Sequence, residues 1–389
     1  MKLKPWQQNL CLVGMGVLSG LLLFELGLRV VGYAYPRFYQ GDELRGRVHR
    51  PGASGWWQQE GEAFVSINAQ GLRDQAYAQS NPPNTYRIAV LGDSFASAFQ
   101  VEQEKTFWAI AEQQLANCPH LPQDNLEVIN FGVAGYGTAQ ELLTLREQVQ
   151  DYQPDFVLLA FLTGNDIRNN SPALEWDQVR PFFIPQGEEF VLDTSFRQDV
   201  LFKINQAKEY LRLGHLLAQT IDSISLRQHN PSNLEQQAKT LIEPGIDEEV
   251  YQPPTTPEWQ KAWQVTEQLI NQMVQEVKAQ GQEFLLVTLS NGSQVYPDPQ
   301  RRDTLKERLG VKDLFYPERR LTELSKQQGF RILTLAPRLQ TDAQNQQQFL
   351  HGFANTAWGI GHWNENGHRL AGKYISEKIC QVFKGLDNG

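Results

Sequence analysis

A serine follows an apolar, strand-like run at a position where it could act as a nucleophile. The stretch VLGDSFASAF, residues 90–99, places Ser94 just past the run RIAVLG. In an open parallel sheet, ligands bind at the carboxyl ends of the strands. The N–H groups at the start of a following helix would favour a negatively charged oxygen beside Ser94. The alternative is that Asp93 and Ser94 only cap that helix.

Two further loops carry groups that could stabilise an oxyanion. NFGVAGYGTAQE, residues 130–141, holds three glycines, where a main-chain N–H can face a ligand with no side chain in the way. FLTGNDIRNN, residues 161–170, brings the side-chain amide of Asn165 to the same expected edge of the sheet. Taken singly, each loop could be an ordinary turn, because Gly, Asn and Asp also favour turns for local reasons.

Two histidines, His362 and His368, are candidates for the base that would activate Ser94. Both lie in TAWGIGHWNENGHRLAG, residues 356–372, around the start of an expected terminal helix that follows Asn364. A histidine in the loop can reach across to Ser94, whereas a histidine inside the helix is more often packed against the sheet. We therefore expect His362 to be the base.

The elements that must position these residues alternate between strand and helix. This alternation predicts an α/β domain with a parallel sheet. The expected strands are residues 87–92, 126–132, 155–162, 283–290 and 330–336. The alternation stops between about residues 168 and 257, which we interpret as an insertion over the strand ends that controls substrate choice. Residues 35–86 form an extended lead-in, with a hairpin expected between residues 49 and 74.

The first 34 residues predict a membrane anchor. A long apolar run follows two lysines and, counted through Tyr33, is long enough to span a bilayer. Glu25 and Arg29 can pair on one helix face. A cleaved signal peptide is the alternative, but a charged pair ahead of the cleavage site is unusual for one. We expect the long domain to lie on the extracytoplasmic side, either periplasmic or at the cell surface.

Composition excludes several classes of protein. The 389 residues carry a formal net charge of -9 and a pI near 5.4, which argues against nucleic-acid binding through a basic surface. The three cysteines form no Cys-x-x-Cys pair, so we expect no metal site. Cys118 and Cys380 could be free thiols or a disulfide. Because one follows the first core helix and the other lies near the end of the last, we expect them within bridging distance, with Cα atoms under about 7 Å apart.

Together, the four stretches that contain Ser94, Gly135, Asn165 and His362 resemble the conserved sequence blocks of the SGNH or GDSL hydrolases. That family carries a serine in Gly-Asp-Ser, a glycine, an asparagine in Gly-x-Asn-Asp and a histidine ahead of a terminal helix, and Ser94, Gly135, Asn165 and His362 match in that order. The resemblance implies a three-layer, flavodoxin-like sandwich over residues 87–389. It also implies that Ser94 and His362 are catalytic, that Ser94, Gly135 and Asn165 form the oxyanion hole, and that no cofactor is needed.

The chain departs from the family pattern at three positions. Phe95 replaces a leucine, where we expect only packing, and Gly164 directly precedes the asparagine. More seriously, Gly359 stands three residues before His362, where the family usually has an aspartate. We therefore expect a Ser-His dyad without a carboxylate, its ring held by a backbone carbonyl or by a group from elsewhere in the chain. Placing an aspartate at position 359 should then leave activity equal or higher, provided that the loop tolerates it.

The resemblance implies an ester hydrolase that works through an acyl-serine intermediate. The expected location favours acyl esters of cell-envelope carbohydrate or lipid, so the expected partners are a small-molecule or glycan ester and the membrane. One alternative is an O-acyltransferase on envelope polysaccharide, in which a sugar hydroxyl replaces water. The other is a catalytically inactive protein that binds a glycan or assembles with envelope proteins, which the missing aspartate favours.

Overall fold

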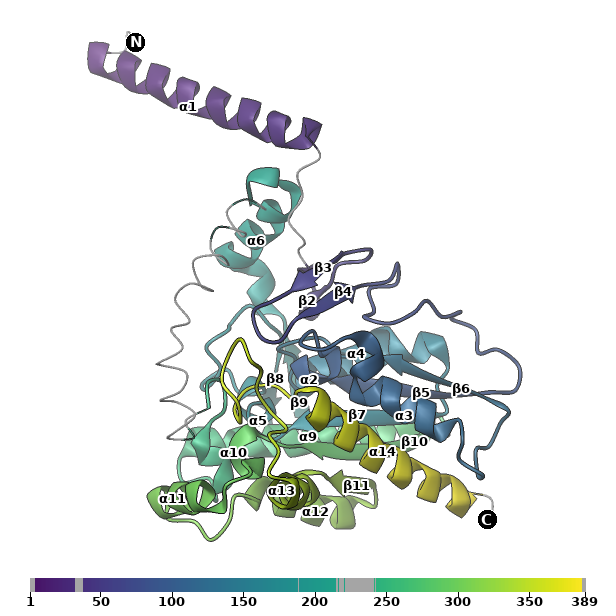
Figure 1. Cartoon of the computed structure of the whole chain (residues 1–389). Coiled ribbons are helices and arrows are strands. Elements are labelled where there is room, and N and C mark those ends of the chain that lie inside the picture. The colour runs from purple at the N-terminus through teal and green to yellow at the C-terminus, as the bar shows by residue number, and fades with distance from the viewer. Residues whose placement is uncertain are drawn as a thin grey trace.

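The fold is built on a five-stranded parallel sheet (Figure 1). The computed structural model describes residues 4–31, 38–187, 189–214, 216, 220, 241 and 243–386. The strands lie in the order β11-β10-β7-β5-β6, and each neighbouring pair is parallel. They are β5 (Thr85–Gly92), β6 (Asn125–Asn130), β7 (Phe156–Leu162), β10 (Glu283–Leu289) and β11 (Arg331–Thr334). These are the five predicted strands, so the α/β prediction is confirmed.

Side chains that alternate along the strands enter two hydrophobic layers. On β7, Val157, Leu159 and Phe161 belong to one core cluster, whereas Leu158 and Ala160 belong to the other, as the two-residue period of a strand requires. The first layer is covered by α4 (Thr138–Glu147), α9 (Pro257–Ala279) and α12 (Tyr316–Gln328). The second is covered by α3 (Phe107–Leu115), α13 (Ala336–Gln346) and α14 (Glu365–Leu386). The expected three-layer sandwich is therefore confirmed.

A disulfide fastens the second layer. Cys118, just beyond α3, is bonded to Cys380 in α14, with Cα atoms 5.9 Å apart. The two helices pack against each other on the same face of the sheet. The predicted bridging distance is thus confirmed, and the alternative of two free thiols is wrong.

The chain reaches the sheet through a helix and two antiparallel hairpins. The helix is α1 (Pro5–Val30). The hairpins pair β1 (Tyr39–Asp42) with β2 (Gly46–His49), and β3 (Ser54–Trp57) with β4 (Ala63–Ser66). The second hairpin lies within the stretch for which we expected one.

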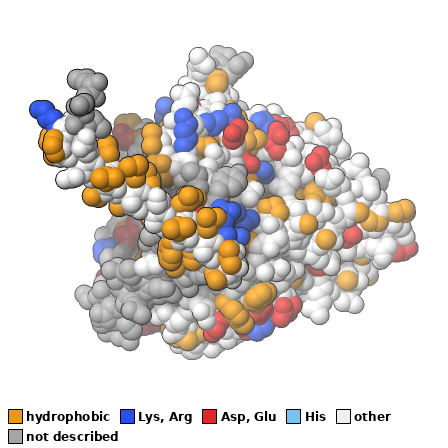
Figure 2. Space-filling view, turned by 90° about the horizontal axis from the view of Figure 1, so that it is seen from above, with side chains coloured by type: hydrophobic (Ala, Val, Ile, Leu, Met, Phe, Trp, Pro, Cys, Tyr) orange, Lys and Arg blue, Asp and Glu red, His pale blue; other side chains and the backbone are white. Residues whose placement is uncertain are grey.

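Helix α1 is the one helix among the described residues that is long and apolar enough to cross a membrane, with a mean hydropathy of 2.0. Its large hydrophobic side chains are exposed along most of its length (Figure 2). Arg29 donates to Glu25 at 2.8 Å, as predicted. Glu25 also accepts the main-chain N–H groups of Arg212 and Leu213 at 3.0 and 2.9 Å. The helix is compatible with a membrane anchor or a signal sequence.

The region between β7 and α9 departs from the alternating pattern, as expected of an insertion. It contains α5 (Asp166–Asn169), the antiparallel pair β8 (Phe182–Gln186) and β9 (Glu189–Asp193), η3 (Ser195–Gln198), α6 (Val200–Tyr210) and η4 (Glu248–Tyr251). The sequence of residues 199–222 has a long helical pattern; α6 forms its first part, and much of the rest lies outside the described residues. Shorter elements elsewhere are α2 (Ser94–Ser97), η1 (Gln103–Lys105), η2 (Val149–Tyr152), α10 (Gly292–Val295) and α11 (Pro299–Leu309).

Candidate active site

Ser94 opens the single-turn helix α2 directly after the central strand β5. Asp93 is the N-cap residue, and its buried carboxylate accepts the N–H of Phe95 at 2.9 Å. Phe95 is itself buried and packs against the ring of His362, with the ring centroids 5.0 Å apart. Asp93 and Phe95 hold the turn from inside, so that Ser94, which is half-buried, presents its hydroxyl at the edge of the sheet.

His362 lies within hydrogen-bond distance of this hydroxyl. Its Nε2 is 2.8 Å from Ser94 Oγ. The main chain around His362 is fixed by the N–H of Gly352, which donates to the His362 carbonyl at 2.9 Å, and by a bridge between His351 and Trp363. The structure therefore brings together the serine and the histidine that the sequence paired.

The other side of the His362 ring is bound by a carboxylate. His362 Nδ1 is hydrogen-bonded to Glu60, and the main-chain N–H of His362 donates to the same carboxylate at 2.8 Å. Glu60 lies in the turn between β3 and β4. The expectation of a dyad without a carboxylate is therefore wrong. The arrangement is a Ser-His-Glu chain whose acid comes from the N-terminal lead-in.

Gly361 makes room for Glu60. Its φ of +86° is a left-handed conformation that few residues other than glycine adopt. A Cβ at this position would lie 2.2 Å from Glu60 Oε1. The carboxylate thus occupies the space that a side chain would otherwise fill, which explains why glycine precedes the histidine here.

Gly359, where the family usually has its aspartate, cannot carry a side chain without rearrangement. Its φ is +90°, and a Cβ would lie 2.3 Å from Cε2 of the Tyr296 ring. The loop therefore does not meet the condition under which we expected an aspartate at position 359 to preserve activity.

The charges of Glu60 and His362 favour each other's ionised form. Burial alone would raise the pKa of Glu60, but the charge of His362 and the hydrogen bonds from it lower the pKa. Burial alone would lower the pKa of His362, but the charge of Glu60 and the hydrogen bond to it raise the pKa above its ordinary value. The site is therefore suited to stabilising an imidazolium, which is the form that a general base acquires during catalysis.

A second carboxylate, Glu243, holds the loop that carries His362. It accepts the main-chain N–H groups of Gly292, Ser293 and Gly361 at 3.1, 3.1 and 3.0 Å. It is buried, and burial raises its pKa to about 7. Because Glu243 belongs to the insertion, that segment fixes the main chain beside the histidine.

Gly135 and Asn165 lie in the loops that follow the strands on either side of β5, and both are half-buried. Neither the Gly135 N–H nor the Asn165 side-chain Nδ2 donates to another residue that the structure describes. Adjacent Tyr136 and Asp166 are buried. Each loop therefore keeps one donor without a partner among the described residues, which is compatible with an oxyanion hole.

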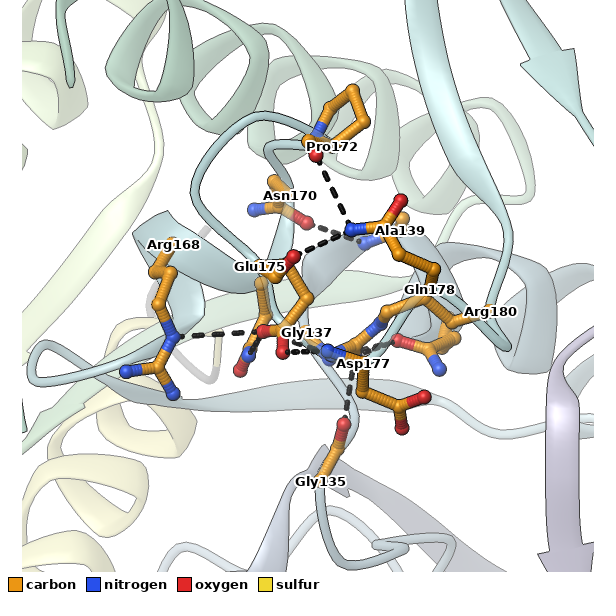
Figure 3. A network of polar contacts seen from close by, with 12 residues as sticks. Gly135, Gly137, Ala139, Arg168, Asn170, Pro172, Glu175, Asp177, Gln178 and Arg180 are labelled. Carbon is orange, nitrogen blue, oxygen red and sulfur yellow. Dashed lines mark hydrogen bonds and ion pairs between the residues drawn. The ribbon is translucent and has the colours of Figure 1, made fainter. Parts of the chain in front are cut away.

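A network of polar contacts joins these two loops (Figure 3). Arg180 donates to the Gly135 carbonyl at 2.7 Å and pairs with Glu175 at 3.2 Å. Asn170 accepts the N–H of Ala139 at 3.0 Å, so the chain after Asn165 is tied to the start of α4. Sequence reasoning missed Arg180 and Glu175, which lie in the segment that we assigned to the insertion.

Two buried aspartates, Asp93 and Asp166, hold the loops that carry Ser94 and Asn165. Asp166 accepts the N–H of Leu162 at 2.7 Å, just as Asp93 accepts that of Phe95. Burial raises the pKa of Asp93 to about 6, and burial together with the charges of Glu141 and Asp93 raises the pKa of Asp166. These carboxyl groups fix backbone turns beneath the accessible residues. No group of three or more metal-binding side chains occurs in the part of the chain that the structure describes.

His368, the competing base, lies in the first turns of α14, away from Ser94. It is buried, and its Nδ1 accepts the N–H of Phe107 at 3.2 Å. Its ring stacks on that of Phe107, with centroids 6.1 Å apart and planes at 6°. Burial lowers its pKa to about 3. His368 therefore packs against α3, as the sequence suggested for a histidine inside the helix.

A parallel α/β sheet with a serine, a histidine and a carboxylate in contact at its carboxyl edge is the arrangement of a serine hydrolase. The chain matches the family GDSL-like Lipase/Acylhydrolase over residues 88–375 and belongs to it. It is an ester-hydrolysing enzyme of this family. The resemblance inferred from the sequence around Ser94, Gly135, Asn165 and His362 is therefore confirmed. No curated protein matches the chain.

The comparison with solved structures matches the chain, at low sequence identity, to an esterase and to a lipase/acylhydrolase. An acetylxylan esterase from Geobacillus stearothermophilus is 14% identical, with 76% of this chain and 94% of that chain covered and a TM-score of 0.38. The lipase/acylhydrolase from Enterococcus faecalis is 13% identical, with 76% and 96% covered and a TM-score of 0.37.

Proposed function

We propose that the protein is a serine esterase in which Glu60, His362 and Ser94 act as a catalytic triad. The observation that carries the proposal is the continuous set of hydrogen bonds from the Glu60 carboxylate through the His362 ring to the Ser94 hydroxyl. An inactive binding protein was the alternative that the missing aspartate favoured. Glu60 supplies the missing acid, which removes the main support for that alternative.

In this mechanism, Ser94 Oγ attacks the acyl carbonyl while His362 Nε2 accepts its proton. Glu60 holds Nδ1–H, which fixes the tautomer, and its negative charge stabilises the imidazolium. The main-chain N–H groups of Ser94 and Gly135 and the amide of Asn165 bind the oxyanion. His362 then protonates the departing alcohol, and water resolves the acyl-serine by the same steps in reverse. A sugar hydroxyl in place of water would make the enzyme an acyltransferase.

We further propose that the enzyme works on the extracytoplasmic side of a membrane, on esters of envelope carbohydrate or lipid. The bond between Cys118 and Cys380 supports this location, because structural disulfides form and persist in oxidising compartments. Helix α1 supplies a segment that can hold the domain at the membrane. Protease added to intact cells or spheroplasts should degrade the domain, and protection until the membrane is lysed would contradict the location.

Covalent labelling tests the proposed nucleophile. A fluorophosphonate probe should label the wild type at Ser94, and the label should be lost in Ser94→Ala and His362→Ala together with hydrolysis of 4-nitrophenyl acetate. Ser97→Ala is the matched control, because Ser97 lies in the same turn, is buried, and its hydroxyl donates to the Ser94 carbonyl at 3.3 Å. A labelled Ser94→Ala protein would refute the assignment.

A further inference from the structure

An arginine from the first hairpin lies directly against the candidate oxyanion loop. A Cβ added to Gly135 would lie 1.8 Å from Arg47 Nη2, so the guanidinium packs on the Gly135 Cα. Arg47 belongs to β2 and is half-buried. A positive charge therefore lies beside the loop where the proposed function puts the reacting ester.

Among the residues that the structure describes, this arginine has no acidic partner, whereas three other arginines of the region do. Arg45 pairs with Asp42, Arg180 with Glu175 and Arg168 with Asp247, at 3.4, 3.2 and 2.8 Å. The Arg47 guanidinium makes neither an ion pair nor a hydrogen bond with any of the residues described in the structure. The Arg47 Cζ lies over the Tyr39 ring, 5.8 Å from its centroid. A half-buried guanidinium with five unused donors is suited to binding a carboxylate or phosphate.

The main chain of Arg47 is fixed to the same loop. The Tyr136 hydroxyl donates to the Arg47 carbonyl at 2.7 Å, and Gln140 Nε2 donates to the Arg45 carbonyl at 3.1 Å. Both donors come from the segment that includes Gly135. The hairpin and the oxyanion loop therefore form one unit, which holds the main chain of Arg47 beside Gly135.

We infer that Arg47 binds an anionic group of the ester substrate, so that the enzyme selects esters bearing a carboxylate or phosphate near the scissile bond. This inference rests on the proposed function and narrows its substrate class. A bidentate guanidinium–anion pair is geometrically specific and, when partly desolvated, stronger than a neutral hydrogen bond. The anion could belong to the acyl part of the substrate or to the alcohol part, such as an acetylated uronic acid.

Two pairs of substrates distinguish these sources. To test an anion on the acyl part, 4-nitrophenyl succinate is compared with its neutral methyl ester. To test an anion on the alcohol part, an O-acetylated methyl glucuronoside is compared with its methyl ester. The wild type should have the higher kcat/KM for the charged member of at least one pair. In Arg47→Gln, the ratio of charged to neutral kcat/KM should fall by about 10- to 100-fold, the range for a hydrogen bond to a charged group.

The controls keep this result separate from a folding defect. Arg45→Gln removes a guanidinium of the same hairpin, one that already pairs with Asp42. The ratio of charged to neutral kcat/KM in this variant should equal that of the wild type. Arg47→Lys keeps the charge without the planar fork, and its ratio should fall between those of the wild type and Arg47→Gln. The inference alone would be overturned if the wild type were labelled at Ser94 and hydrolysed neutral esters, but neither substrate pair showed a preference for the charged member that depended on Arg47. Absence of labelling and of all turnover would overturn the proposed function and this inference with it.

Discussion

The carboxylate of Glu60 binds two N–H groups of His362, a residue 302 positions later in the chain. One bond goes to the ring and the other to the main chain, so Glu60 fixes both the rotation of the imidazole and the path of its loop. In the usual family pattern, the acid lies three residues before the histidine on the same loop. Here the acid comes from a hairpin that precedes the sheet, so the hairpin becomes part of the active site.

Replacing Glu60 by glutamine should reduce turnover severely while leaving the fold intact. The amide keeps the size of the side chain but loses the charge that stabilises the imidazolium. Disturbing the equivalent acid in an enzyme built around it costs about four orders of magnitude in kcat. The measurement is kcat for 4-nitrophenyl acetate, together with thermal unfolding to verify the fold.

Glu62→Gln is the matched control for Glu60→Gln. Glu62 lies two residues further along the same turn, is exposed and accepts a hydrogen bond only from Gln58 among the described residues. Its loss should leave kcat close to that of the wild type. If Glu60→Gln behaved like Glu62→Gln, the Glu60 contact would be structural and His362 would act without an acid.

The pH dependence of kcat/KM should shift when Glu60 is neutralised. His362 accepts a proton only when its ring is neutral, so activity rises as pH increases through its pKa. The negative charge of Glu60 raises that pKa above the ordinary value of about 6.5. In Glu60→Gln, the pKa should fall and the acid limb of the residual kcat/KM profile should move to lower pH. An acid limb at an unchanged pH would show that another group controls it.

The sequence predicted the features that local patterns determine, such as the strands and the loops after them. It did not predict the contacts between residues that are far apart in the chain. The five strands were identifiable from short apolar runs, and the places of Ser94, Asn165 and His362 follow from the loops that flank those runs. Glu60 carries no such signal, because nothing in QQEGE, residues 58–62, distinguishes it from Glu62. The glycine at position 359 showed that an acid was missing from the usual place. It did not show which of the many other acids would reach the ring.

The insertion illustrates the same limit. Its departure from strand-helix alternation was visible, and we interpreted it as a cover that governs substrate choice. The contacts of Glu243 with Gly361 and of Arg180 with Gly135 depend on the folded positions of both partners. Replacing the whole segment would therefore disturb the catalytic loops as well as any selectivity, and single substitutions are the cleaner experiment.

Introducing an aspartate at Gly359 should impair the enzyme, because the observed loop does not tolerate a side chain at this position. The left-handed backbone costs a non-glycine residue about 1–3 kcal/mol, and the Tyr296 ring blocks the first carbon of any side chain. Gly359→Ala should lose stability to a similar extent, because the obstruction begins at Cβ. Thermal unfolding and kcat of both variants measure this. A Gly359→Asp enzyme that matched or exceeded the wild type would show that the loop can rearrange to accept a second acid.

Removing the disulfide should destabilise the domain without altering the site directly. The bond joins residues 262 positions apart, and the loss of such a crosslink costs about 2–5 kcal/mol. Chemical unfolding of the Cys118→Ser/Cys380→Ser protein in detergent should therefore have a lower midpoint than that of the wild type. Reductant should lower the wild-type midpoint and leave the double variant unchanged. Cys11→Ser, which removes the free thiol in α1, is the control, and equal midpoints for all three proteins would contradict a stabilising role.

Truncating Asn165 tests the oxyanion hole. The structural hydrogen bonds of Asn165 come from its main chain, whose carbonyl accepts the N–H of Asn169 at 2.9 Å. Asn165→Ala keeps this bond and removes only the side-chain donor. If the amide binds the oxyanion, kcat should fall about 100- to 1,000-fold with little change in KM, because the interaction forms in the transition state.

Asn165→Asp gives the matched comparison, since it keeps the shape of the side chain but has no N–H donor when ionised. It should lose at least as much turnover as Asn165→Ala, because its negative charge would oppose that of the oxyanion. Unfolding midpoints of both variants should stay near the wild-type value. Near-native kcat in Asn165→Ala would make Asn165 a turn residue and leave oxyanion binding to the main-chain N–H groups of Ser94 and Gly135.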